Sequence, residues 1–432
     1  MDSQSRHRSR IVAVDVSKIG DFVFQDLQKG FLAEWALHPT EASEDHAKIL
    51  EAAHHIRHAD SPVAFPTETV YGLGADASRS SAVQGIYRAK GRPADNPLIV
   101  HISSLDQLRK LLDPVYTRAV SPDPIPQIYH PLIERFWPGP LTVLVPLPEP
   151  SPFAPEVTST LATVGVRMPS SRLALALIQS AGVPIAAPSA NASTKPSPTT
   201  AAHVYHDLQG RIELILDGGP CDVGVESTVV DGLSDPPLIL RPGGVSLAML
   251  RSCPGWESVQ IGYHNGSRPE SRPKAPGMKY KHYAPKARVL LFRGQLDIVT
   301  MHRTANGATA IGVLLTSGEN HWLLQRAQST ASESKANGAH THQGSPETLL
   351  HSMLNLEDGS DELLTMWLLK IGPGIEDVAR GLFSALRAFD SQKVDLIFVE
   401  CVDEHQDDTA AAVMNRLRKA AESEVGSEAS TS

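Results

Sequence analysis

The chain has 432 residues, 41% of them hydrophobic, which is enough to form more than one domain core. Its formal net charge of -9 and isoelectric point near 6.0 argue against a protein whose main task is to hold nucleic acid, because such domains concentrate positive charge. Its three cysteines, Cys221, Cys253 and Cys401, lie far apart, which argues against a disulfide framework or a thiolate zinc site.

The N-terminal region has no hydrophobic core of a signal peptide, and no apolar run reaches the roughly 18 residues that span a bilayer. We therefore expect a cytoplasmic protein without membrane contact. The arginines and serines of the first ten residues resemble a mitochondrial presequence, but Asp2, Asp15 and Asp21 dilute that pattern. A minor mitochondrial pool is left open.

Residues 1–43 are predicted to be a polar leader, and 44–255 an α/β domain. Within 44–58, Ile49, Ala52, Ala53 and Ile56 recur at the spacing of one helix face. Further along, short apolar runs alternate with helix-like stretches such as 173–181. The runs predicted to be strands are 98–102, 141–146, 164–168, 184–187, 214–216, 227–230 and 238–240.

The second half begins with a predicted linker, 256–286, whose SRPESRPKAPGMKYKHYAPK is rich in proline and lysine and lacks apolar periodicity. Residues 287–422 then contain RVLLF, IGVLL, MWLLKIG, an amphipathic helix and VDLIFVE. Strand, helix and strand in this order predict a small parallel or mixed sheet with a Rossmann-like layout. The polar stretch 328–346 is predicted to be a disordered insertion, and 423–432 a disordered tail.

No phosphate loop, HExxH or GxSxG motif occurs, which disfavours the common nucleotide-binding and hydrolase classes. Instead PTETVYGLG, at 66–74, turns through hydroxyls, a carboxylate and two glycines, and such a loop can bind a small polar ligand. By itself it could be an ordinary glycine turn. In KGRPADNPLIVH, Lys90 and Arg92 suit a triphosphate, although a single Lys-x-Arg is usually a solvated surface pair.

Four further turns follow predicted strands: GVRMP with Arg167, APSAN at 187–191, ESTVVD with Ser227, and LRPGG with Arg241. Each carries hydroxyls, an amide or an arginine. In open α/β sheets, ligands bind beyond the strand ends, so several such turns can meet at one crevice.

In this order, PTETVYGLG, KGRPADNPLIVH, VRMP, APSAN, ESTVVD, LRPG and KYKHYAPK resemble the YrdC-like family in its longer, two-domain form. The resemblance is dense from residue 61 to about 286 and looser beyond. It implies a YrdC-like twisted open sheet with flanking helices and a positively charged concave cavity, followed by the smaller C-terminal Rossmann-like α/β domain. The family consists of L-threonylcarbamoyladenylate synthases.

The resemblance also implies the site residues, by motif position. The implied threonine site consists of Thr69, His101, Arg167, Ser189 and Ser227. The implied ATP site consists of Arg92, Asn96, Thr163, Asn191, Thr199 and Arg241, with Lys90 on the phosphates and Tyr283 folded over the nucleotide. Tyr280 is the alternative to Tyr283. His101 could be the base for the threonine amine, but a ligand contact is favoured.

The implied reaction joins L-threonine, bicarbonate and ATP into threonylcarbamoyl-AMP with release of pyrophosphate, for the modification of adenosine beside the tRNA anticodon. Magnesium is expected with ATP, and a tRNA threonylcarbamoyl transferase is the expected recipient. One alternative is an RNA-binding module that uses the same basic cavity, with RNA contact otherwise weak or secondary. Another is a carbamoyl-phosphate-using domain like that of hydrogenase maturation factors, whose zinc-finger cysteine pairs are absent here.

Overall fold

The computed structural model describes residues 8–25, 34–39, 43–93, 96–118, 120–263, 283–305, 307–317, 320, 322–325, 350–355, 363–404 and 408–425. The chain divides into two compact units. The described part of the first unit lies before residue 264, and the second comprises the described residues from Tyr283 onward together with Thr194–Pro196. Each unit is described by itself.

The first unit is built on an eleven-stranded mixed sheet. In sheet order its strands are β1 (Arg10–Ala13), β10 (Leu214–Asp217), β4 (Val63–Pro66), β5 (Tyr71–Asp76), β9 (Ile185–Ala186), β6 (Ile99–His101), β8 (Thr163–Arg167), β7 (Leu141–Pro146), β11 (Thr228–Asp231), β12 (Leu238–Arg241) and β13 (Gln260–Ile261). Strands β6 and β8 are parallel, so their carboxyl ends lie at the same edge.

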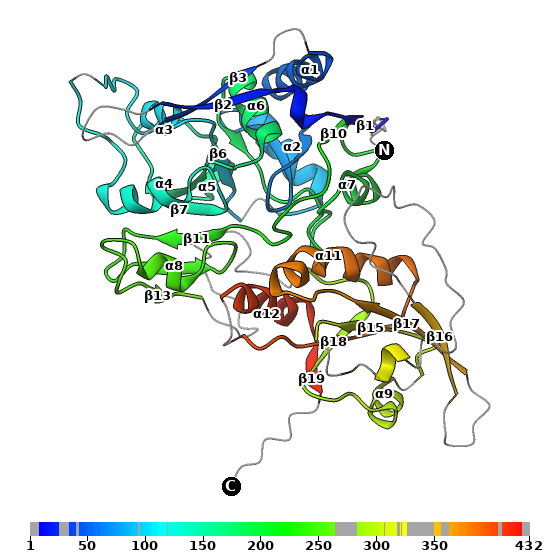
Figure 1. The fold of residues 1–432 in the computed structure, drawn as a ribbon. Coiled ribbons are helices and arrows are strands. Elements are labelled where there is room, and N and C mark those ends of the chain that lie inside the picture. The colour runs from blue at the N-terminus through cyan, green and yellow to red at the C-terminus, as the bar shows by residue number, and fades with distance from the viewer. Residues whose placement is uncertain are drawn as a thin grey trace. The chain divides into compact units, whose positions relative to one another are not determined.

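Helices surround this sheet (Figure 1). They are α1 (Glu44–His58), α2 (Ser80–Lys90), α3 (Leu105–Leu112), α4 (His130–Phe136), α5 (Pro155–Thr158), α6 (Arg172–Ala181), α7 (Ala201–Leu208) and α8 (Leu247–Arg251), with 3-10 turns η1 (Val16–Lys18) and η2 (Gln127–Tyr129). Helix α1 begins where the sequence predicts, because the Ser43 hydroxyl accepts hydrogen bonds from the Asp45 and His46 amides.

Alternate residues of the strands supply two cores, one on each face of the sheet. In β10, Leu214 and Leu216 belong to the core that contains α1 and α6, whereas Ile215 belongs to the larger core that contains α2, α3, α4 and α7. In β4, Val63 and Ala64 divide in the same way. The period of two in the strands therefore places helices on both faces.

The predicted leader, residues 1–43, is instead part of the first unit where the structure describes it. Strand β1 pairs in parallel with β10, and Ile19 is fully buried against the core of α1 and α6. Strands β2 (Gly20–Gln25) and β3 (Glu34–Pro39) form a separate antiparallel pair. The prediction failed because the partner of β1 lies some two hundred residues away in the sequence.

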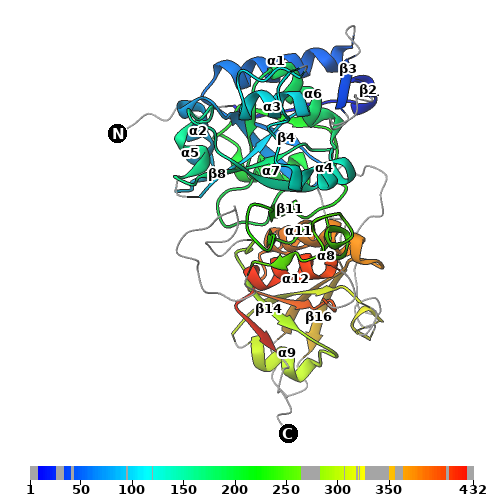
Figure 2. The same ribbon diagram turned by 90° about the vertical axis from the view of Figure 1, so that its left-hand side faces the viewer.

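The second unit contains a six-stranded, mostly parallel sheet. Its order is β16 (Leu350–Asn355), β17 (Leu363–Lys370), β15 (Ala310–Leu315), β18 (Leu396–Glu400), β14 (Arg288–Phe292) and β19 (Ser423–Val425), where β16 and β17 are antiparallel. Figure 2 shows α9 (Ile298–Ala305) on one face and α11 (Ile375–Ser391) with α12 (Asp408–Ala420) on the other. The predicted α/β class of both parts is confirmed.

Three predictions for the second half need comment. The predicted linker, 256–286, is wrong at its start, because Trp256 is fully buried in the larger core of the first unit and β13 pairs in parallel with β12. Residues 423–425, placed in a disordered tail, form β19, which pairs in parallel with β14. The predicted insertion at 328–346 lies outside the described residues. Within the described residues, no helix is long and apolar enough to cross a bilayer.

Candidate active site

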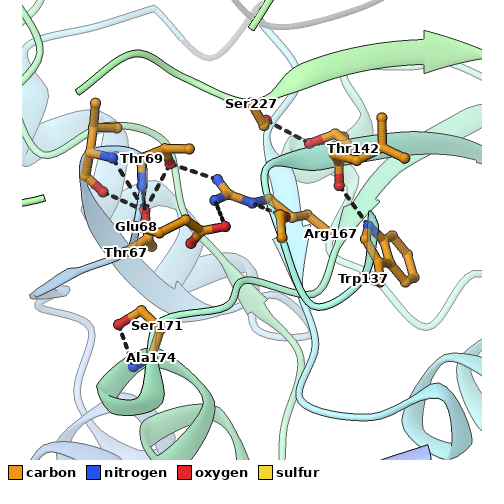
Figure 3. A network of polar contacts seen from close by, with 12 residues as sticks. Thr67, Glu68, Thr69, Trp137, Thr142, Arg167, Ser171, Ala174 and Ser227 are labelled. Carbon is orange, nitrogen blue, oxygen red and sulfur yellow. Dashed lines mark hydrogen bonds and ion pairs between the residues drawn. The ribbon is translucent and has the colours of Figure 1, made fainter. Parts of the chain in front are cut away.

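The centre of the site is Arg167, the last residue of β8. It is 4% exposed, and it stands opposite His101, the last residue of the parallel strand β6. Its guanidinium donates from Nε to the Gly139 carbonyl (3.2 Å) and from Nη1 to the Thr69 hydroxyl (2.9 Å). Its Nη2 lies 2.7 Å from a carboxylate oxygen of Glu68. Figure 3 shows the guanidinium between Thr69 and Glu68.

The loop that carries Thr69 and Glu68 is held by its own hydroxyls. Thr67 Oγ1 accepts hydrogen bonds from the amides of Thr69 (3.2 Å) and Val70 (3.3 Å), and it donates to the Val70 carbonyl (2.7 Å). The two threonine hydroxyls are 2.8 Å apart. Threonines competing in this way for backbone groups produce a tight turn. The PTET sequence thus directs Thr69 and Glu68 toward Arg167.

His101 is an uncharged ligand or hydrogen-bonding group at neutral pH. Burial first, and the positive charge of Arg167 second, lower the pKa of His101 from 6.5 to about 3. Its Nδ1 is buried and has no hydrogen-bond partner among the described residues. A neutral imidazole can accept one hydrogen bond and donate another.

This depressed pKa should make the protein less stable as the pH falls from 6.5 toward 3. The unfolded imidazole takes up a proton near pH 6.5, whereas the folded one stays neutral until about pH 3, so protons favour the unfolded state in between. At pH 5 the effect is about 2 kcal/mol. Denaturant titrations at pH 7 and pH 5 should show a smaller loss in His101→Gln than in wild type. The exposed His58→Gln should behave as wild type, and equal losses in all three would contradict the prediction.

A second cluster joins Ser227 and Arg241. The guanidinium of Arg241 donates from Nε to the Ser227 carbonyl and from Nη2 to its hydroxyl, each at 3.0 Å. The Ser227 hydroxyl also shares a 2.8 Å hydrogen bond with Thr142 of β7. The antiparallel pairing of β11 and β12 brings ESTVVD beside LRPGG. The side chains of Ser227, Arg241 and Thr142 are buried, so few other hydrogen-bond partners are available to them.

The third group is formed by Lys90 and the turn at 187–191. Lys90, the last residue of α2, is 3% exposed, and its ammonium donates to the carbonyls of Ser189 (2.5 Å) and Asn191 (2.8 Å). The Ser189 hydroxyl donates to Asn191 Oδ1 (2.5 Å). In this structure Lys90 therefore tethers the turn that carries two predicted ligand residues. Its contact with phosphate stays a prediction.

Of the remaining predicted ATP residues, Asn96 is fully buried, and its side-chain amide has no partner among the described residues. Arg92 is half-buried and follows Gly91, whose left-handed conformation ends α2. Thr199 is buried, with its hydroxyl 3.4 Å from His203 Nδ1. Thr163 begins β8, about 13 Å from the strand end that carries Arg167. Its contact with ATP stays a prediction.

Tyr283 lies in the second unit, where it is 5% exposed. Its ring stacks on Phe383 of α11 at a centroid distance of 5.2 Å, and the Arg416 guanidinium of α12 lies 6.0 Å from the ring centre. The backbone of Tyr283 has a φ of 65°, a strained value for this residue type. The position of Tyr283 over a nucleotide stays a prediction. Tyr280 lies outside the described residues.

Sequence reasoning did not include Glu68 or Thr142 in the site. An acidic residue between two threonines in PTET was a signal for Glu68, whereas Thr142 lies within an ordinary apolar strand. Buried arginines and hydroxyls at strand ends, together with the buried amide of Asn96, make the first unit an α/β domain suited to small ligands with anionic groups.

The comparisons with known proteins identify the family. A family model described as "Telomere recombination" matches residues 55–243, and one described as "Threonylcarbamoyl-AMP synthase, C-terminal domain" matches residues 245–422. The threonylcarbamoyl-AMP synthase of Schizosaccharomyces pombe is 45% identical over 393 residues, 88% of this chain and 89% of that protein. The chain belongs to the threonylcarbamoyl-AMP synthase family, as the seven motifs predict.

Two further relatives support this. The Bacillus subtilis threonylcarbamoyl-AMP synthase is 41% identical over 88% of this chain and 95% of its own length. The crystal structure of Pyrococcus abyssi Sua5 complexed with L-threonine superimposes with a TM-score of 0.69 at 36% identity, covering 97% of this chain and all of the other. The likeness therefore extends over both units.

Proposed function

We propose that this enzyme makes L-threonylcarbamoyl-AMP from L-threonine, bicarbonate and ATP, with release of pyrophosphate. The observation that carries the proposal is the buried guanidinium of Arg167, held among Thr69, His101 and Glu68 at the ends of β6 and β8. A planar guanidinium with hydroxyls beside it suits an amino-acid carboxylate. Membership of a family whose curated members are named for this reaction supports the same substrate set.

For threonine, Arg167 would bind the carboxylate, and Thr69, His101, Ser189 and Ser227 would offer hydroxyl and imidazole groups to the rest of the molecule. These side chains are carried by strand ends and, in the case of Ser189, by the turn at 187–191. That turn is fixed to β5 by hydrogen bonds from the Leu73 amide to the Pro188 carbonyl and from the Ala190 amide to the Tyr71 carbonyl, both 2.8 Å. A turn fixed in this way can present Ser189 without further ordering.

For ATP, we assign Arg92 to the phosphates, with Lys90 close by. Asn96 supports this assignment, because its buried amide offers two donors and an acceptor to a ligand. The other proposed contacts are Asn191, Thr199 and Arg241. Thr163, at the start of β8, is a further proposed contact, with a part of ATP distant from Arg167.

Two chemical steps follow. The threonine ammonium group loses a proton, and the resulting amine nitrogen attacks the carbon of CO2 derived from bicarbonate. Loss of a second proton from this nitrogen gives the N-carboxylate. An oxygen of this carbamate then attacks the α-phosphorus of ATP, and the bond to the β-phosphate oxygen breaks to release pyrophosphate. The carbamate oxygen is already anionic, so the protein mainly positions the reactants and stabilises charge.

Magnesium would accompany ATP. The described residues contain no group of three His, Cys, Asp or Glu side chains arranged to hold a metal ion. A site of arginines, hydroxyls and amides fits an ion that phosphate oxygens and water coordinate, and the ion would neutralise charge on the phosphates. The product would pass to a tRNA threonylcarbamoyl transferase, since a mixed anhydride hydrolyses in water.

The test is pyrophosphate release by the purified full-length protein with ATP, magnesium, bicarbonate and labelled threonine. Release should require both threonine and bicarbonate. Arg92→Ala should lower the rate about 100-fold, since one lost charge-assisted phosphate contact is worth about 3 kcal/mol in a transition state. Arg88→Ala, at an exposed arginine of the same helix end, should retain the wild-type rate.

Folded wild-type protein that releases no threonine-dependent pyrophosphate would reject the proposal. Binding to tRNA, weakening steeply between low and moderate salt, would then favour the RNA-binding alternative.

A further inference from the structure

Glu68 is a buried carboxylate to which the reaction described above assigns no role. Its side chain is 8% exposed and pairs with Arg167 at 2.7 Å. This ion pair lacks the alignment of a hydrogen bond, and no described residue donates a hydrogen bond to either Glu68 oxygen. The neighbouring hydroxyls of Thr67 and Thr69 bond to each other and to the Val70 carbonyl and Arg167 instead.

Such a group is costly for the fold. An ionised carboxylate can accept about four hydrogen bonds, and its burial without donors is strongly unfavourable. Replacing a buried ion pair by apolar residues often costs nothing, so the pair itself does not explain why a carboxylate stands here. A ligand that brings N–H donors and positive charge to Glu68 would explain it.

We infer that Glu68 binds the α-ammonium group of the amino-acid substrate while Arg167 binds its α-carboxylate. The inference rests on the proposed function, because it assigns a further residue to the same substrate. An amino acid is a zwitterion, so its entry replaces one ion pair of the protein by two ion pairs with the ligand. The net charge of the site does not change.

The surrounding groups leave this role to Glu68. Glu226 is also buried, but its carboxylate already accepts the Ser197 hydroxyl at 2.5 Å. His101 is uncharged at neutral pH because burial and Arg167 lower its pKa to about 3. Glu68 thus supplies the negative charge that lies directly beside the guanidinium, and a zwitterion that enters the site takes the place of their direct contact.

The consequence is selectivity for α-amino acids over α-hydroxy acids. Both ligand classes offer a carboxylate to Arg167, but only the amino acid offers a cation to Glu68. A hydrogen bond between charged groups is stronger than one from a neutral hydroxyl, and we expect a preference of about 10- to 100-fold for the amino acid.

The experiment is calorimetry on the full-length protein without ATP. L-Threonine is compared with (2S,3R)-2,3-dihydroxybutanoate, in which a hydroxyl replaces the ammonium group. Wild type should show the preference for threonine, and Glu68→Gln should reduce the ratio of the two affinities to about one. A Glu68 that merely orients Arg167 would weaken both ligands by the same factor, so an unchanged ratio in Glu68→Gln overturns the inference.

Asp123→Asn is the matched control, because it removes the carboxylate of another buried arginine pair in the same unit, Arg109 with Asp123 at 2.9 Å. It should keep the wild-type ratio of affinities.

If Glu68→Gln does not fold, a crystal structure of the wild-type protein with threonine tests the inference. The amine nitrogen within about 3.2 Å of a Glu68 oxygen supports the inference, and an amine bound only to other groups overturns it.

The two proposals fail in different ways. Wild-type protein that neither binds threonine nor releases threonine-dependent pyrophosphate rejects the proposed function. Wild type that does both, with a ratio of affinities that Glu68→Gln leaves unchanged, rejects the role of Glu68 alone.

Discussion

Replacing Arg167 with lysine should lower kcat/KM for threonine about 100-fold. The guanidinium makes three contacts in different directions, with the Gly139 carbonyl, the Thr69 hydroxyl and the Glu68 carboxylate. A lysine ammonium keeps the charge but cannot reproduce this planar arrangement or bind a carboxylate in a bidentate manner. A loss of about 3 kcal/mol, typical of a damaged buried charge contact, corresponds to this factor. Pyrophosphate release at varied threonine measures it.

The matched control is Arg109→Lys, since Arg109 is a fully buried arginine that pairs with Asp123 away from the strand ends. Its variant should keep kcat/KM for threonine once folding is verified. The KM for ATP should change little in Arg167→Lys. Equal effects on both substrates, or equal losses in the two variants, would show that Arg167 acts on the fold and not on threonine.

Gly243→Ala should lower the free energy of unfolding of the first unit by about 3 kcal/mol. A Cβ at this position would lie 2.3 Å from the Glu226 carbonyl oxygen and 2.3 Å from the Thr228 amide nitrogen. Backbone atoms on both sides of Ser227 would have to move, because no flexible side chain can absorb the clash. The shift would also separate Ser227 from Arg241, so activity should fall together with stability.

Urea denaturation followed by circular dichroism provides the measurement, with Gly72→Ala as the control. A Cβ on Gly72 meets its nearest atoms at 3.4 Å, an ordinary contact distance. That variant should unfold within about 1 kcal/mol of wild type. Equal midpoints for the two variants would mean that the turn around Ser227 tolerates displacement.

The helices and strands of the site were largely predictable because their signals are local. Helix α1 occupies Glu44–His58 as its apolar periodicity indicates, and β7 occupies Leu141–Pro146 as its apolar run indicates. The first strand was missed because Arg10–Ala13 gives a weak local signal, and its hydrogen bonds go to β10. Pairing with this distant segment makes Arg10–Ala13 a strand, although the local sequence favours a polar leader.

The sequence places several site residues in the correct turns, but it does not indicate which residues they contact. Lys90 is the last residue of α2, and its ammonium bonds to the turn at 187–191, a hundred residues further along the chain. Tyr283 is buried by Phe383, also a hundred residues away. Such contacts depend on packing between elements, which no local pattern encodes.

The sequence by itself determined the family, the α/β class of both parts and the strand-end turns that carry the site, because motif order, apolar periodicity and turn chemistry are properties of short segments. The tertiary structure alone decided that β1 closes one edge of the sheet, that Thr163 lies apart from the strand end of Arg167, and that Glu68 pairs with that arginine. The physical reason is that burial, charge pairing and hydrogen-bond partners are set by residues far apart in the chain, which come together only when the sheet has formed.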